Sequence, residues 1–210
     1  MHNEYTLNSD LRKRKTLLHN VAKTNSSWKY RMFFTVLLFI LSAAIMISIC
    51  ILLLFHPTTA MGVFIFICFG IMMACVPFFI AIGIKNKAKY ICAFPYSSYA
   101  NASLFLEQDD LRYEFWQVGP TEPAAYSSKR AVYNDEDKFT FIIDKKSIID
   151  IEFDNNGVCN VLGKGKINAP KWAELTKSEI DEISKDFSFI LAFDADNAKE
   201  IIINWRNYNL

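Results

Sequence analysis

Two long apolar runs lie in the first half of the chain, at residues 32–55 and 60–84, and neither contains a charged side chain. A helix rises about 1.5 Å per residue, so each run is long enough to cross the ~30 Å hydrocarbon core of a bilayer. Buried core helices of soluble proteins are usually shorter than either run. The pattern therefore predicts two transmembrane helices, joined by a turn at residues 56–59 in which Pro57 ends the first helix.

Basic residues flank the ends of these runs that lie away from the turn. Residues 1–31 contain seven lysines and arginines, and Lys85, Lys87 and Lys89 follow the second run, whereas residues 56–59 contain none. Short segments rich in lysine and arginine stay on the cytoplasmic side of a membrane. We therefore expect a multi-pass membrane protein with the turn outside and both termini in the cytoplasm.

After residue 102 the pattern changes to short runs in which apolar and polar residues alternate. This period is typical of strands that bury one face, and turns rich in Asp, Asn and Gly separate several of the runs. Six such runs are enough for a domain with its own core. The predicted strands cover residues 103–108, 111–116, 138–144, 147–153, 158–165 and 186–193.

Two helices and a loop are predicted between and after these strands. In the polar stretch at residues 168–185, Thr176 and Glu179 have the spacing of a capping box that opens a short helix. Residues 119–130 contain two prolines and no periodicity, which predicts a loop. Residues 194–208 begin with an aspartate cap and predict a helix that closes the domain. The inward face of that helix is predicted to carry Ala198, Ile201, Ile202 and Trp205.

These elements divide the chain into successive regions. The N-terminal region leaves two interpretations open, an interfacial amphipathic helix or an unstructured basic tail. The predicted regions are a basic cytoplasmic segment at residues 1–31, transmembrane helices at 32–55 and 60–84 around an external turn at 56–59, a basic juxtamembrane linker at 85–101 and a cytoplasmic domain at 102–210.

The predicted domain lacks the residues on which common catalytic sites depend. All three histidines lie before residue 60, at His2, His19 and His56, so the domain contains no imidazole to act as general base or to activate a Ser or Cys nucleophile. The five cysteines do not have the spacing of a zinc site. We expect no catalytic activity, no metal and no cofactor.

Acidic residues alternate along one predicted strand, at Asp150, Glu152 and Asp154, which places their side chains on one face. Such a row either binds a cation or faces water while the apolar residues between its members face the core. We favour the second interpretation, because charged side chains are rarely buried. The core-facing residues would be Ile149, Ile151 and Phe153.

Two glycines alternate with two lysines at residues 163–166, a composition found in phosphate-binding loops. The spacing of a nucleotide-binding P-loop is absent, and the flanking residues predict strands. A lipid phosphate is then the candidate ligand, with Lys164, Lys166 and Lys171 as contacts. Residues 90–210 contain 13 lysines and arginines and 20 aspartates and glutamates, a formal net charge of −7, which opposes approach to an anionic leaflet. We favour a bend that glycine permits, with the lysines in solvent.

Several antiparallel strands followed by one amphipathic helix are the order of elements in pleckstrin-homology-like (PH-like) domains. Residues 104–115, 145–166 and 187–205 carry this order. In these segments the chain resembles bacterial membrane proteins with two N-terminal helices and a cytoplasmic PH-like domain, including the YcxB-like proteins. The resemblance implies an α-helical membrane hairpin followed by a mainly-β (α+β) domain in a bacterial inner membrane, and it does not imply a particular chemistry.

The function that these features favour is a membrane-tethered interaction module without catalytic activity. Besides its contact with the lipid bilayer, it would bind an unidentified protein partner, in regulation or in immunity against a membrane-acting toxin. A first alternative is an accessory subunit of a membrane complex or transporter, recognised through its hairpin, and a second is a domain that senses anionic lipids. We expect no nucleic-acid partner and no small-molecule substrate. The small residues that would serve helix contacts are Ser42, Ala43, Ala44, Gly62 and Gly70.

Overall fold

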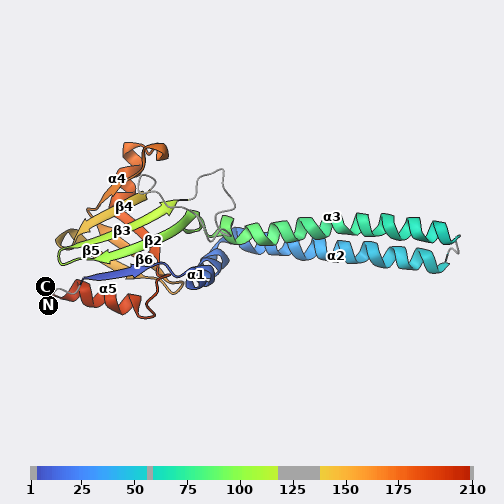
Figure 1. Cartoon of the computed structure of the whole chain (residues 1–210), viewed down its shortest axis with the longest axis horizontal. Helices are drawn as coiled ribbons and strands as arrows, with labels where there is room; N and C mark the ends of the chain where they lie inside the picture. The colour runs from blue at the N-terminus through green and yellow to red at the C-terminus, as the bar shows by residue number, and fades with distance from the viewer. Residues whose placement is uncertain (1–3, 56–58, 118–137, 209–210) are drawn as a thin grey trace. The chain divides into compact units, whose positions relative to one another are not determined.

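The computed structural model describes residues 4–55, 59–117 and 138–208, and the chain divides into two compact units (Figure 1). The hairpin unit is Val21–Ala93. The sheet unit combines Met1–Asn20 with Phe94–Leu210. The predicted loop at residues 119–130 and most of the predicted turn at residues 56–59 lie outside the described residues.

Two long helices make up most of the hairpin unit. α2 covers Ser26–Phe55 and α3 covers Ala60–Cys92, and the two lie side by side (Figure 1). Both are long and apolar enough to cross a membrane. Each extends beyond the predicted apolar run, so that much of the predicted juxtamembrane linker at residues 85–101 is helical.

Small side chains allow these two helices to approach closely. Gly70 and Ala74 are buried on α3, and a Cβ atom on Gly70 would lie 3.2 Å from Cγ1 of Ile49 and closer still to its Cδ1. The Ser42 hydroxyl donates a hydrogen bond to the carbonyl oxygen of Ala74 at 2.9 Å. Small residues and hydroxyl groups at the contact are typical of helix pairs in membranes, where close packing drives association. Ser42 and Gly70 therefore hold the hairpin itself together.

The sheet unit contains two antiparallel sheets. Five strands form the first sheet in the order β1-β2-β3-β4-β7, and three form the second in the order β5-β6-β8. Helix α5, Ala198–Asn207, follows the last strand. The prediction of antiparallel strands closed by a C-terminal helix is therefore confirmed. The strands are β1 Tyr5–Asn8, β2 Tyr99–Leu106, β3 Asp110–Gln117, β4 Lys138–Asp144, β5 Ile148–Phe153, β6 Val158–Gly163, β7 Lys166–Asn168 and β8 Asp186–Ile190.

Aromatic rings from the two sheets meet in the core of the sheet unit. Tyr113 of β3 and Phe141 of β4 are buried, as alternation along these strands predicts. The ring of Phe141 stacks on Phe187 of β8 with 4.1 Å between centroids, and Tyr113 stacks on Phe189 with 4.7 Å. Such pairs are worth about 0.5–1.5 kcal/mol each beyond the area they bury. These stacks hold the second sheet against the first.

Residues 5–8 form a strand that the sequence pattern did not predict. β1 pairs antiparallel with β2, and Leu7 of β1 lies opposite Leu104 with both side chains buried. The N–H of Asp10 donates to the carbonyl oxygen of Ala192 at 2.8 Å, and that of Asp194 to Asn8 at 2.8 Å. Residues 5–10 are therefore part of the sheet unit, and neither an unstructured tail nor an interfacial helix describes them.

A helix does follow this strand. α1 covers Leu11–Thr24, and the Asp10 carboxylate caps it by accepting hydrogen bonds from the N–H groups of Arg12 and Lys13 at 2.7 and 3.3 Å. Leu18 on this helix is buried. The basic residues predicted to form a membrane-flanking segment thus begin inside the sheet unit.

Ile149 departs from the predicted strand pattern. The alternation along residues 147–153 predicts that it faces the core, but its side chain is 75% exposed. The pairing of β5 with β6 shifts register between Ile148 and Asp150, so Ile148 packs against the core in its place. Ile151 and Phe153 face the core as predicted.

The closing helix has the predicted inward face but a different cap. Ala198, Ile202 and Trp205 are buried, and Ile201 is partly buried against the core. The predicted aspartate cap is wrong, because Asn197 precedes the helix and its side chain makes no capping hydrogen bond. Burial of the helix face, more than its cap, therefore stabilises this end of the chain.

The capping box predicted at Thr176 and Glu179 is confirmed. The Thr176 hydroxyl accepts a hydrogen bond from the Glu179 N–H at 3.3 Å, and the Glu179 carboxylate accepts one from the Thr176 N–H at 2.8 Å. These bonds from Thr176 hold the pKa of Glu179 below its ordinary value. The helix they open is α4, Lys177–Lys185, which lies between β7 and β8 in the chain and places Ile183 against the core.

Candidate functional site

The glycines at residues 163–166 are required by close packing. A Cβ atom on Gly163 would lie 2.6 Å from Cδ1 of Ile143, and one on Gly165 would lie 2.6 Å from Cζ of Phe141. Neither glycine has a positive φ, so a left-handed bend is not the reason for them. The N–H of Gly165 donates to the carbonyl oxygen of Ser184 at 2.9 Å, which removes one donor that a bound phosphate would need.

The three lysines predicted as anion contacts lie near this segment. Lys164 and Lys166 are exposed, and neither side chain makes a hydrogen bond or ion pair with another described residue. Lys166 begins β7, which is one edge of the five-stranded sheet. Lys171 begins a 3₁₀ helix, η4 (Lys171–Ala173), and its side chain lies outside the described part of the chain. A contact of these lysines with an anion remains a prediction from sequence.

The acidic row on β5 has separate structural partners. Asp150 accepts a hydrogen bond from Arg206 of α5 at 2.9 Å, which holds the pKa of Asp150 below its ordinary value. Asp154 accepts hydrogen bonds from the N–H groups of Asn156 and Val158 in the turn that joins β5 to β6. Among the described residues no cluster of three or more acidic, His or Cys side chains could hold a metal ion.

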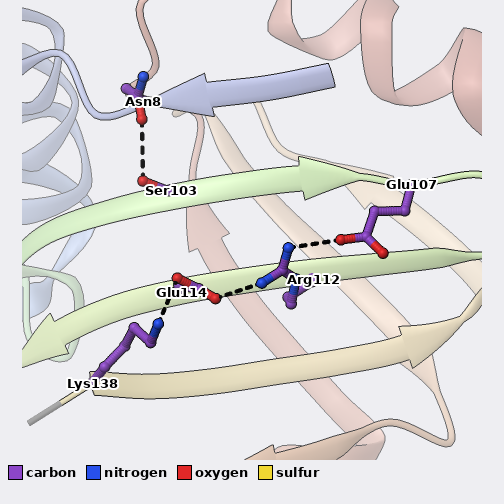
Figure 2. A network of polar contacts seen from close by, with 6 residues as sticks. All are labelled: Asn8, Ser103, Glu107, Arg112, Glu114 and Lys138. Carbon is purple, nitrogen blue, oxygen red and sulfur yellow. Dashed lines mark hydrogen bonds and ion pairs between the residues drawn. The ribbon is translucent and has the colours of Figure 1, made fainter. Parts of the chain in front are cut away.

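A network of charged side chains crosses the outward face of the five-stranded sheet. Figure 2 shows Arg112 of β3 between Glu107 and Glu114, with Lys138 of β4 on the other side of Glu114. Arg112 lies 2.7 Å from Glu107 and 2.8 Å from Glu114, and Lys138 lies 3.0 Å from Glu114. The guanidinium group of Arg112 also lies over the ring of Phe105, 4.2 Å from its centre. The network joins the β2–β3 turn to β3 and β4.

Glu114 is the central member of this network. It is 7% exposed and is the only buried acidic residue in the part of the chain that the structure describes. A buried carboxylate is costly unless it is paired, and here one oxygen faces Arg112 while the other faces Lys138. Because both oxygens are engaged, we interpret Glu114 as a structural ion-pair residue of the sheet.

A pocket with a volume of about 390 Å³ opens where β8 of the second sheet approaches β3, β4 and β7 of the first. We call it the aromatic pocket, because rings from both sheets line it. The rings of Phe115 and Phe139 stack with 4.9 Å between their centroids, and Phe187 lies 6.0 Å from Phe115. Aliphatic side chains from β7, α4 and the segment between them complete its apolar part. They belong to Ile167, Leu175 and Ile183.

Polar groups gather at one side of the aromatic pocket. Asp186 and Ser188 lie two positions apart on β8, and Tyr96 belongs to a 3₁₀ helix, η1 (Tyr96–Ser98), that precedes β2. The Tyr96 hydroxyl lies near the side chain of Ser188. Arg14 of α1, which is buried, donates from Nη2 to the Tyr96 carbonyl oxygen at 3.0 Å and so fixes the backbone of η1.

The charged residues that act on Tyr96 are both acidic. Burial raises the pKa of Tyr96 above its ordinary value, and the negative charges of Asp154 and Asp186 raise it further, whereas the nearby side chain of Ser188 opposes them. A phenol near carboxylates keeps its proton, so Tyr96 can donate a hydrogen bond at neutral pH. The polar side of the pocket is therefore an uncharged hydroxyl pair beside a carboxylate.

The sequence contains only part of the signal for this pocket. Alternation of apolar and polar residues along β3, β4 and β8 accounts for the burial of Phe115, Phe139 and Phe187. The polar side depends on Tyr96, which lies in the segment predicted as a juxtamembrane linker, and on its contact with β8. No local pattern indicates that contact.

Comparisons of the chain with protein-family models, with curated proteins and with solved structures give no match. The geometry of the aromatic pocket is then the guide to function. Ligand pockets are typically concave, mostly apolar and about 300–1,000 Å³ in volume, with a few polar groups that orient the ligand. The aromatic pocket has this size and composition, so the chemistry it supports best is binding.

We predict that Glu114→Gln lowers the stability of the sheet unit by about 1–3 kcal/mol, because Arg112 and Lys138 would then face a neutral amide. Glu107→Gln is the matched control, since Glu107 is 42% exposed and its carboxylate pairs with Arg112 alone among the described residues. It should cost less than about 1 kcal/mol. Thermal unfolding of the full chain in detergent, followed by tryptophan fluorescence, measures both effects. An equal or larger loss for Glu107→Gln would contradict the central role of Glu114.

Proposed function

We propose that the protein is a membrane-anchored binding module without catalytic activity. In this proposal α2 and α3 anchor the chain in a bacterial inner membrane, and the sheet unit binds a protein partner in the cytoplasm. The observation that carries the proposal is that one chain joins two helices long and apolar enough to cross a membrane to a sheet unit that has its own aromatic core and a pocket. Regulation and immunity against a membrane-acting toxin are the roles that we propose for such a module.

The arrangement of the sheet unit supports a PH-like assignment. Two antiparallel sheets packed on a shared core, followed by one C-terminal helix, are compatible with that fold. The N-terminal strand β1 lies outside the three segments in which the chain resembles YcxB-like proteins. We therefore propose a PH-like domain whose first sheet is extended by a strand from the other side of the membrane hairpin.

A second candidate is an accessory subunit that a membrane complex recognises through the hairpin. Ala43 and Ala44 favour it, because they are exposed on α2, where small side chains would allow another helix to approach closely. Gly62 is only partly buried and could take part in the same way. Anionic-lipid sensing through Lys164 and Lys166 is a weaker candidate, since the net charge of −7 over residues 90–210 opposes it.

The proposed orientation predicts which positions react with a membrane-impermeant maleimide in intact cells. A cysteine at Thr58, in the proposed external turn, should be labelled, and a cysteine at the exposed Asp181 of α4 should be labelled only after lysis. Native Cys159 cannot replace the second position, because it is fully buried and burial raises the pKa of its thiol. Labelling at Asp181→Cys in intact cells would contradict the cytoplasmic placement of the sheet unit.

Exchange of the hairpin separates the two candidate functions. Residues 32–84 would be replaced by an unrelated two-helix hairpin with the flanking lysines and arginines retained, and partners would be crosslinked in native membranes and identified by mass spectrometry. The binding-module proposal predicts that the exchanged chain retains the partners of the natural chain. The unrelated hairpin without the sheet unit is the control and should capture none of them. Loss of the partners on exchange would refute the proposal in favour of the accessory-subunit function.

A further inference from the structure

We propose that the aromatic pocket binds an organic cation, an ammonium group carried on an apolar body. The apolar body would lie in the pocket, beside the residues Phe115, Phe139 and Phe187 that line it, and the ammonium group would lie near Asp186. The inference rests on the proposed binding function, and it names the chemistry that the sheet unit recognises.

The size and walls of the pocket select the apolar body. A volume of about 390 Å³ accommodates a fused-ring or branched side chain but not a long lipid tail. Its lining is dominated by three phenylalanine rings and by aliphatic groups of β7 and α4. Fixed rings offer an aromatic or alkyl group dispersion contacts without further loss of side-chain entropy.

The charge of the lining selects the cation. Asp186 is the only charged residue among the described residues that line the pocket, and no lysine, arginine or histidine is among them. Tyr96 and Ser188 add hydroxyl groups next to this carboxylate. An ammonium group gains from the carboxylate of Asp186, whereas a carboxylate ligand is repelled by it.

A second groove of the sheet unit has a lining of the opposite charge. It is lined by Arg12 and Lys13 of α1 and by Lys199 of α5, with Asp196 paired to Lys13 at 2.7 Å. Its charged lining is therefore mainly basic, in contrast to the lining of the aromatic pocket. The acidic character of the aromatic pocket thus follows from the residues that line it.

This inference departs from the expectation that the chain takes no small-molecule substrate. Tyr96 lies in the predicted linker and Asp186 begins a predicted strand, and no pattern in the sequence brings the two together. The ammonium group could belong to a free amine or to a lysine side chain of a protein partner. Both sources share the chemistry that Asp186 recognises, and the experiment includes one ligand for each.

Binding of two matched indoles to the full chain in uncharged maltoside micelles tests the proposal. Tryptamine and indole-3-propionate share the indole ring and carry opposite charges at neutral pH. We expect tryptamine to bind at least about tenfold more tightly, as measured by isothermal titration calorimetry after subtraction of empty micelles. Nα-acetyl-lysine methylamide is titrated in parallel, and tighter binding of this ligand than of tryptamine would identify a protein side chain as the source of the ammonium group.

Two variants with the same change in net charge test whether the preference for tryptamine depends on Asp186. Asp186→Asn should reduce the preference for tryptamine to less than about threefold, while indole binding persists. Asp181→Asn, in an exposed position of α4 outside the lining, should leave the preference unchanged. Unchanged thermal unfolding of both variants shows that the fold is intact.

Three results would overturn the inference. They are equal binding of the two indoles to the natural chain, no saturable binding of tryptamine up to about 10 mM, and equal loss of preference in both variants. The proposed module function would survive any of these results if the partners are retained after hairpin exchange, so the two failures are distinguishable.

Discussion

Hydrogen bonds between β1 and β2 hold the start of the chain to a strand that lies beyond α1, α2 and α3 in sequence. Asn8 and Ser103, 95 positions apart, are joined through their side chains at 3.2 Å (Figure 2). The N–H of Ser9 donates to the carbonyl oxygen of Ala102 at 3.0 Å. Because of this pairing, the hairpin unit is an insertion between two neighbouring strands of one sheet. Both chain connections to the hairpin unit therefore leave from the same sheet unit.

The two segments that lead to the hairpin unit are also hydrogen-bonded to each other within the sheet unit. Arg14 of α1 donates to the carbonyl oxygen of Tyr96, and Asp10 is bonded to the segment after β8 through Ala192. The same contact of Arg14 positions η1, which supplies the polar side of the aromatic pocket through Tyr96. The hydrogen bond from Arg14 therefore links α1 to a residue that lines the pocket.

Features encoded by local pattern could be predicted from the sequence. The two apolar helices follow from uninterrupted hydrophobic runs, the β2–β3 hairpin follows from alternation, and the capping box at Thr176 and Glu179 follows from spacing alone. β1 could not be predicted in this way, because a strand of four residues has little periodicity and its partner lies far along the chain. The exposure of Ile149 depends on a register shift, which no alternation pattern contains. The aromatic walls of the pocket were predictable as inward positions, whereas the approach of Tyr96 to Ser188 is a tertiary contact.

The pairing of β1 with β2 can be tested directly by a disulfide. We would introduce Asn8→Cys and Ser103→Cys together, with a protease site at residues 56–59, and oxidise the full chain in membranes. Adjacent positions on paired strands lie within reach of a disulfide, so the two fragments should stay joined on a non-reducing gel after cleavage. Asn8→Cys with Lys166→Cys is the control and should not crosslink, because β1 and β7 lie at opposite edges of the sheet. Separation of the fragments in the first variant, or equal crosslinking in both, would contradict the insertion of the hairpin between neighbouring strands.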